Sequence, residues 1–226
     1  MEYILVGFGW NVIGCKQIKQ GFLGVNQLEV NNFKKQITEL VEQHRNARII
    51  PFVHWDYELE FYPHPLHRDL AHWAIEHGVY AVIGCHPHCV QDVEVYNGHI
   101  IVYSLGNFMF PNNYYFNGKL AFPQFTRKEY GLKLEERKLI EFAHDKKQNT
   151  IEIVDESTIT NSTIEELDLG QRAYRKWFKE HRRKKKLLPI YDNPGETINS
   201  LKDGWVNLRA KVIYTMVNIG LKGAPK

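Results

Sequence analysis

Three histidines, His54, His86 and His88, have the residue type and spacing that suit metal binding. His86 and His88 are separated by Pro87 alone, and side chains at alternate positions of an extended chain project to the same side. Imidazole nitrogen binds zinc, iron, nickel and copper, and it joins carboxylates in mixed sites. These side chains are therefore candidate metal ligands, although an H-x-H pattern alone is weak evidence.

The elements predicted around these histidines would bring them together. Residues 48–55 and 80–86 are compact apolar runs that predict buried strands, the first of which ends at His54. Helical spacing over 28–44 and 65–76 places a helix before each strand, an alternation typical of a parallel α/β unit. Ligands bind outside the carboxyl ends of such strands, so the three imidazoles are expected to lie together at this edge of the sheet.

The other histidines are predicted to be surface residues, on polar faces or in turns. They are His44, His64, His67, His72, His77, His99, His144 and His181.

Hairpins are predicted after this unit. Asn97-Gly98 between two strand-like runs is the strongest short hairpin signal, and a second hairpin is predicted over 139–159, with its turn at 145–149. We expect a first domain over 1–160. A helical extension over 161–226 is expected to follow it.

The composition is that of a globular protein, with 43% hydrophobic and 24% charged residues. The net charge of +3 indicates no particular partner, but residues 172–186 hold nine Lys or Arg and one acid. Three cysteines without a disulfide-framework pattern favour a reducing compartment. The opening residues suit neither a membrane span nor a signal peptide, so a cytoplasmic protein is expected.

Three short segments follow one another in a specific order. They are H-W-x-x-E at 54–58, G-x-H-P-H-x-x-Q at 84–91 and Y-S-L-G-N-F at 103–108, with a predicted helix between the first two. Together they resemble the signature of the bacterial capsule synthesis (CapA) family, which makes capsule polysaccharide or poly-γ-glutamate and has a calcineurin-like metallophosphatase fold. The resemblance covers roughly residues 50–110.

The resemblance implies an α/β sandwich of two packed mixed sheets flanked by helices, with a two-metal centre between the loops. It assigns His54, His86 and His88 as metal ligands. It also makes Glu58, Gln91 and Asn107 candidate contacts to those ligands or to substrate. Turn and capping chemistry would explain these last three residues equally well.

The family's earlier ligands, an Asp-x-His, a Gly-Asp and an Asn-x-His segment, have no counterpart before His54. The first 53 residues contain no Asp, and their one histidine is His44. The chain is therefore interpreted as the C-terminal half of the fold, without its N-terminal strands. Three neutral imidazoles supply no negative charge for two dications, so at most one ion (Mn, Zn or Fe) is expected.

Cys85 stands where the family often has another histidine. A small buried hydrophobe is the favoured interpretation, and a soft metal ligand is the alternative.

The basic segment 172–186 also has two interpretations. Its aromatic residues recur at helical spacing, so the plainer one is a helix packed on the domain with solvated cations outside. The other is contact with an anionic polymer or with a membrane surface, which would make the protein peripheral to the membrane. Nucleic acid is not expected, because no recognised binding fold accompanies the patch.

Two functions follow from the resemblance. One is a metal-dependent phosphoester hydrolase of capsule or poly-γ-glutamate synthesis, and catalytic residues for it are not assigned. The other is a truncated or split, non-catalytic member that binds a partner in an assembly complex. That partner would be a separate N-terminal half or a second copy.

Overall fold

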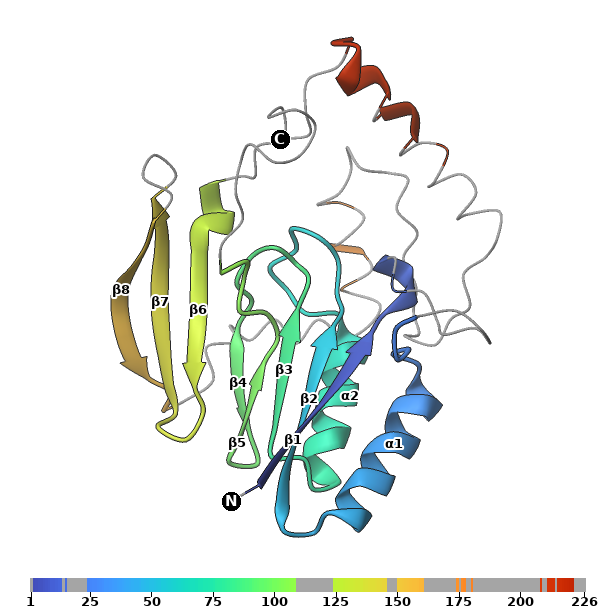
Figure 1. The fold of residues 1–226 in the computed structure, drawn as a ribbon, viewed down its shortest axis with the longest axis vertical. Helices are drawn as coiled ribbons and strands as arrows, with labels where there is room; N and C mark the ends of the chain where they lie inside the picture. Colours follow the sequence, from blue (N-terminus) through green and yellow to red (C-terminus); the bar gives the residue numbers. More distant parts are fainter. Residues whose placement is uncertain are drawn as a thin grey trace.

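Figure 1 shows the computed structural model of the chain. The structure describes residues 2–13, 15, 24–108, 124–145 and 150–160, together with 174, 176, 177, 180, 208, 211–213 and 215–221. The extension expected over 161–226, including the basic segment 172–186, therefore lies mostly outside the described residues, and its boundary stays a prediction. Within the described part of the chain, no helix is long and apolar enough to cross a membrane.

A five-stranded mixed sheet forms the centre of the fold. Its strands are β1 (Glu2–Gly9), β2 (Ala47–His54), β3 (Ala81–Cys85), β4 (Val93–Tyr96) and β5 (His99–Val102), in the order β1-β2-β3-β5-β4. All neighbouring strands are parallel except β4, which pairs antiparallel with β5. The carboxyl ends of β1, β2 and β3 consequently meet at one edge, as the strand–helix alternation predicts (Figure 1).

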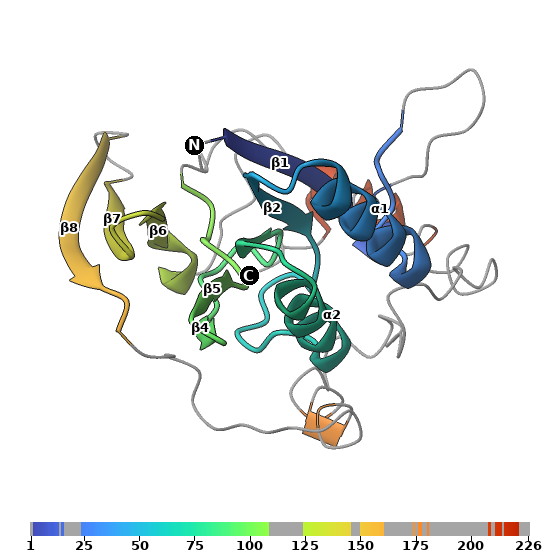
Figure 2. The ribbon, with the colours of Figure 1, turned by 90° about the horizontal axis from the view of Figure 1, so that it is seen from below.

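Two helices cover one face of this sheet, α1 (Val30–Gln43) and α2 (Pro65–Glu76) (Figure 2). The Glu29 carboxylate caps α1 by accepting from the backbone N–H groups of Asn31 and Asn32. Pro65 occupies the first turn of α2, and Gly78, with a φ of 93°, lies just past its end. Both helices were predicted to within two residues.

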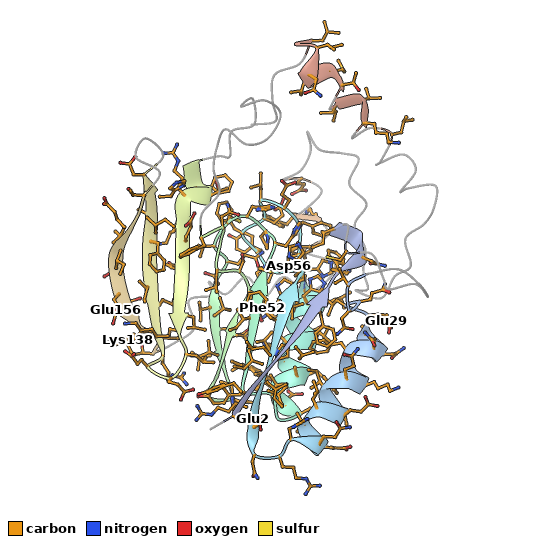
Figure 3. All side chains as sticks on the ribbon, in the orientation of Figure 1. Glu2, Glu29, Phe52, Asp56, Lys138 and Glu156 are labelled. Carbon is orange, nitrogen blue, oxygen red and sulfur yellow. The ribbon has the colours of Figure 1, made fainter. Side chains whose placement is uncertain are left out.

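A three-stranded antiparallel sheet lies on the other side, in the order β6-β7-β8. The strands are β6 (Lys128–Lys133), β7 (Lys138–Asp145) and β8 (Thr150–Thr158). The hairpin predicted over 139–159 is confirmed as β7 and β8, while the residues of its turn from 146 to 149 lie outside the described part. Lys138 and Glu156 form an ion pair across these two strands (Figure 3).

Two apolar cores hold the layers together. One lies between the five-stranded sheet and the two helices and contains Phe8, Phe33, Val53 and Leu70. The other contains Val93, Ile100 and Val102 of the larger sheet and Leu139 of β7. The expectation of an α/β protein with two sheets and helices is confirmed, but the expectation that both sheets are mixed is wrong for the second one, whose strands are all antiparallel.

The prediction that every histidine outside the candidate site lies on the surface is wrong for three of them. His64 and His67 are buried at 1% and 0% exposure, and His144 at 7%. His64 caps α2 by accepting from the Leu66 backbone N–H, and His67 lies one turn further on the helix face that meets the sheet. His64 and His67 are thus buried where α2 packs on the sheet, whereas His144 is buried on strand β7.

Candidate metal centre

The carboxyl ends of β2 and β3 place the three candidate histidines side by side. His54 is the last residue of β2, and its ring lies 4.7 Å from that of His86, centroid to centroid. The His86 and His88 rings are 5.5 Å apart. In Figure 3 the nearby Asp56 marks this end of the sheet. The structure therefore brings together all three predicted ligands.

The backbone between His86 and His88 differs from the extended segment assumed above. β3 ends at Cys85, and both histidines have positive φ, 104° for His86 and 59° for His88. Such conformations are uncommon outside glycine and typically cost 1–3 kcal/mol each. The two rings thus meet because the chain turns at both positions, and alternation along a strand does not explain their proximity.

Asn107 makes two hydrogen bonds with His88, one to its ring and one to its backbone carbonyl. Its Oδ1 lies 2.7 Å from His88 Nδ1, and its Nδ2 donates to the His88 carbonyl at 3.1 Å. A hydrogen bond to one ring nitrogen fixes the ring orientation and directs the other nitrogen outward. This contact is the one expected of a residue that orients a metal ligand, so an ion would meet His88 Nε2.

Gly84 and Trp55, which belong to the same sequence motifs, pack closely together next to the candidate site. The Trp55 indole crosses β3 and donates from Nε1 to the Tyr103 carbonyl at 2.9 Å. A Cβ on Gly84 would lie 2.1 Å from that carbonyl oxygen and 2.3 Å from Trp55 Nε1. Position 84 therefore requires glycine, and all three signature segments meet at this contact.

Burial keeps two of the imidazoles neutral. Desolvation lowers the pKa of His86 to about 3, and the nearby His54 and His88 rings contribute to this shift. Desolvation also lowers the pKa of His54. A metal ligand must be the neutral imidazole, so both rings have the required charge state at neutral pH.

The donor atoms are close together without being arranged around one point. Among the described residues, no group of three or more His, Cys, Asp or Glu side chains is placed to hold a metal ion. The donor chemistry fits zinc or a similar cation, because the imidazoles are adjacent, and neutral at His54 and His86. Metal binding by these three residues would therefore require their side chains to move.

The other two predicted contacts differ in their exposure. Glu58 is exposed in the turn after β2. Gln91 is buried, and its Nε2 donates to the Glu60 carbonyl at 2.9 Å rather than to a histidine. Gln91 also lines a cleft of about 510 Å³ bounded by Phe61 and Tyr130.

Sequence reasoning missed a buried polar cluster beneath the site. The Asp56 carboxylate contacts His67 Nδ1 and accepts from the His64 backbone N–H at 3.1 Å. The His67 ring stacks on Trp55 at 5.2 Å. The spacing of His64 and His67, three residues apart on a helix, was the available signal, because such positions share a face.

The fold and the cluster define an α/β protein with a histidine-rich site at the carboxyl edge of a mostly parallel sheet. Residues 13–112 match the family described as bacterial capsule synthesis protein PGA_cap. This segment is therefore related to that family, with partial coverage of the chain.

Two curated relatives agree with this assignment. The PGA biosynthesis protein CapA of Bacillus subtilis (strain 168) is 37% identical over 78 residues, 34% of this chain and 20% of that protein. The capsule biosynthesis protein CapA of Bacillus anthracis is 32% identical over 99 residues, 43% of this chain and 24% of that protein. The aligned part thus spans about a fifth to a quarter of each relative. This part of the chain is thus similar to the CapA proteins of capsule and poly-γ-glutamate biosynthesis, by distant and partial homology.

Proposed function

We propose that this chain serves capsule or poly-γ-glutamate synthesis as a protein that binds one divalent metal ion through His54, His86 and His88. The observation that supports this most strongly is the contact of three histidine rings at the carboxyl ends of β2 and β3. The Asn107 contact to His88 supports it further, since ligand histidines are usually oriented by a second hydrogen bond.

Charge argues for one ion and against two. A two-metal centre holds its ions about 3.5–4 Å apart, and their repulsion is usually offset by carboxylate ligands. The three candidate ligands are imidazoles, and burial disfavours the charged form of His54 and His86. A single bound ion would act as a Lewis acid toward a phosphoryl or carbonyl oxygen.

On this proposal the chain alone has negligible phosphoester hydrolase activity. Turnover would require further ligands for a second ion, which a partner chain such as a second copy would supply. The same donor set is consistent with a non-catalytic, partner-binding role, which the activity measurement below separates from catalysis.

The test is metal stoichiometry combined with turnover. Metal content per chain would be measured by mass spectrometry after incubation with manganese or zinc, and phosphodiesterase activity would be assayed on the same samples. We expect one ion per chain and no turnover above the metal-only blank. His86→Ala and His88→Ala should each lose the ion.

A matched control is His44→Ala. His44 follows α1 at the amino end of β2, the opposite end of the sheet from His54. Its replacement should leave the metal content unchanged. Two ions with robust hydrolysis would contradict the proposal, and so would full metal content in the His86 and His88 variants.

A further inference from the structure

Strand β1 forms one edge of the five-stranded sheet, and its outer backbone groups are paired only at its carboxyl end (Figure 2). At that end the Gly9 N–H donates to the Asn26 carbonyl at 2.8 Å, and the Gly9 carbonyl accepts from the Leu28 N–H at 2.8 Å. Both main-chain groups of Gly9 therefore face away from β2.

The same outward orientation recurs at Gly7, Leu5 and Tyr3, because alternate residues of a strand turn their main-chain groups to the same side. The Gly7 carbonyl agrees with this, since it accepts from Asn26 Nδ2 at 3.0 Å. Among the described residues, no strand pairs with the outer side of β1 from Tyr3 to Gly7, and the Leu5 side chain is 68% exposed. This stretch therefore presents a row of main-chain donors and acceptors that fits another extended strand.

The free stretch of β1 lacks the devices that usually protect a sheet edge. Its sequence, YILVG over 3–7, contains no charged residue and no proline. By contrast β8, the edge strand of the smaller sheet, carries Glu152, Asp155 and Glu156, which would repel the same strand of a second copy. Of these two edges, β1 is the one suited to pair with another strand.

The free stretch is complementary to itself when two copies run antiparallel about Leu5. In that register Leu5 lies opposite Leu5 of the second copy and Tyr3 lies opposite Gly7, so the outward N–H and C=O groups of these residues pair with one another. Gly7 suits the position opposite Tyr3, because even a Cβ at Gly7 would meet nothing within 4 Å. A second copy of this chain is therefore the occupant that the edge fits.

We propose that two copies of this chain pair through β1, antiparallel about Leu5, and so join their five-stranded sheets into one. The contact is isologous and closes at two chains. It is confined to one strand and its flanking side chains, less than the roughly 1,600 Å² of a standard interface, so a weak dimer with a Kd of about 1–100 μM is expected. Antiparallel pairing places the two histidine sites at opposite ends of the joined sheet, so the dimer does not depend on metal binding.

Sedimentation equilibrium over a concentration series that spans the expected Kd tests this dimer. The mean mass should rise from that of the 26.6 kDa chain towards twice this value. Leu5→Lys and Leu5→Glu should each weaken the dimer by at least about 10-fold, since the contact between the two leucines is lost and like charges meet directly opposite each other. An equimolar mixture of the two variants should form dimers again, because opposite charges then meet at this position.

Val154→Lys is the matched control, because Val154 is 59% exposed on the edge strand β8 and lies outside the proposed contact. This variant should dimerise as the parent does, and circular dichroism would verify that each variant is folded. A parent that stays monomeric throughout the series would overturn the inference. So would a Leu5→Lys variant that dimerises as the parent does, or a mixture of the two charged variants that stays monomeric. The metal stoichiometry described above tests the proposed function separately.

Discussion

At the scale of single residues, the contacts around the site explain why particular residue types recur in the signature segments. Glycine is required at position 84 because the Trp55 indole lies across β3 to reach the Tyr103 carbonyl. Asn107 is required because an amide offers an acceptor to the His88 ring and a donor to the His88 carbonyl. Each requirement gives a measurable expectation.

Gly84→Ala should destabilise the fold strongly. The new Cβ would lie 2.1 Å from the Tyr103 carbonyl oxygen, a backbone atom that cannot move aside cheaply. We expect a loss of about 2–4 kcal/mol in the free energy of unfolding, measured by urea denaturation. Gly7→Ala is the control, since a Cβ there meets nothing within 4 Å, and it should change stability by less than about 0.5 kcal/mol. Equal stability of the two variants would contradict the account.

Asn107→Ala should weaken metal binding without removing it. Loss of the 2.7 Å contact frees the His88 ring to rotate, and residues that orient metal ligands typically contribute about 10- to 100-fold in affinity. Zinc titration by calorimetry would measure the change. Asn31→Ala, at an exposed position of α1, should bind as the parent does. An unchanged affinity in Asn107→Ala would remove Asn107 from the site.

The sequence predicted which histidines meet, because strand ends can be located from apolar runs. It could not predict how they meet. The positive φ angles of His86 and His88 follow from the loop that crosses them, where the Leu59 N–H donates to the Pro87 carbonyl at 2.7 Å. Such a contact depends on two segments distant along the chain, and neither contains a local signal for it.

At the scale of elements, a buried charge network fixes α2 to the edge of the five-stranded sheet. The Glu94 carboxylate on β4 accepts from Arg68 Nε at 3.2 Å and Nη2 at 2.8 Å, and from the Tyr103 hydroxyl at 2.6 Å. His72 Nε2 lies 2.9 Å from the same carboxylate. Burial alone would raise the pKa of Glu94, but the contacts with His72, Arg68 and Tyr103 lower it to about 2.

Glu94→Gln should therefore lower stability at neutral pH by about 2–3 kcal/mol, since it removes one charge from a partly buried network. The folded pKa of Glu94 lies below its unfolded value. Its contribution is thus present above about pH 4.5 and lost as the pH falls towards 2. Thermal unfolding at pH 7 and pH 3 measures both effects, and the difference between variant and parent should shrink at pH 3.

The control for this change is Glu39→Gln, which breaks the exposed Lys35–Glu39 pair on α1. Exposed pairs contribute less than about 1 kcal/mol, so little change is expected. A loss in Glu94→Gln no larger than that of the control would refute the structural role of the network.

β6 carries a buried carboxyl group with the opposite pH dependence. Glu129 is 1% exposed, its Oε2 has no hydrogen-bond partner, and desolvation raises its pKa to about 7. A raised folded pKa contributes stability that is present below about pH 4.5 and lost as the pH rises through 7. The protein should therefore lose stability between pH 5 and pH 8 at this residue.

Glu129→Gln should remove this loss, because the amide has the same shape and does not ionise. Relative to the parent, the variant should gain about 1–3 kcal/mol between pH 5 and pH 8, measured by urea denaturation at each pH. Glu152→Gln, on exposed β8, should follow the parent curve. Parallel curves for parent and Glu129→Gln would exclude the buried ionisation.

The elements themselves were predictable to different degrees. Residues 2–102 carry clear signals, since buried parallel strands are apolar throughout and helices repeat at 3.6 residues. β6 was not predicted, because its sequence KEYGLK has charged ends and a glycine and lacks a clean alternation. Its strand conformation comes from pairing with β7, where Gly131 gives room for the Phe142 ring.

At the scale of the whole molecule, the two sheets and two helices place one histidine-rich edge where the family signature segments meet. The strand–helix alternation before β3 and the hairpins after it follow from the sequence pattern. The buried polar cluster of Asp56 and His67 and the Cys85 thiol beside His54 do not, because they depend on the packing of loops against the sheet edge. These features lie at the site where the function is proposed.

Anomalous diffraction from zinc-soaked crystals tests the central claim most directly. The account predicts one zinc peak at the carboxyl ends of β2 and β3, within bonding distance of His54, His86 and His88. Data collected above and below the zinc edge would identify the element. No peak at that position, or a peak that none of these three rings contacts, would contradict the account.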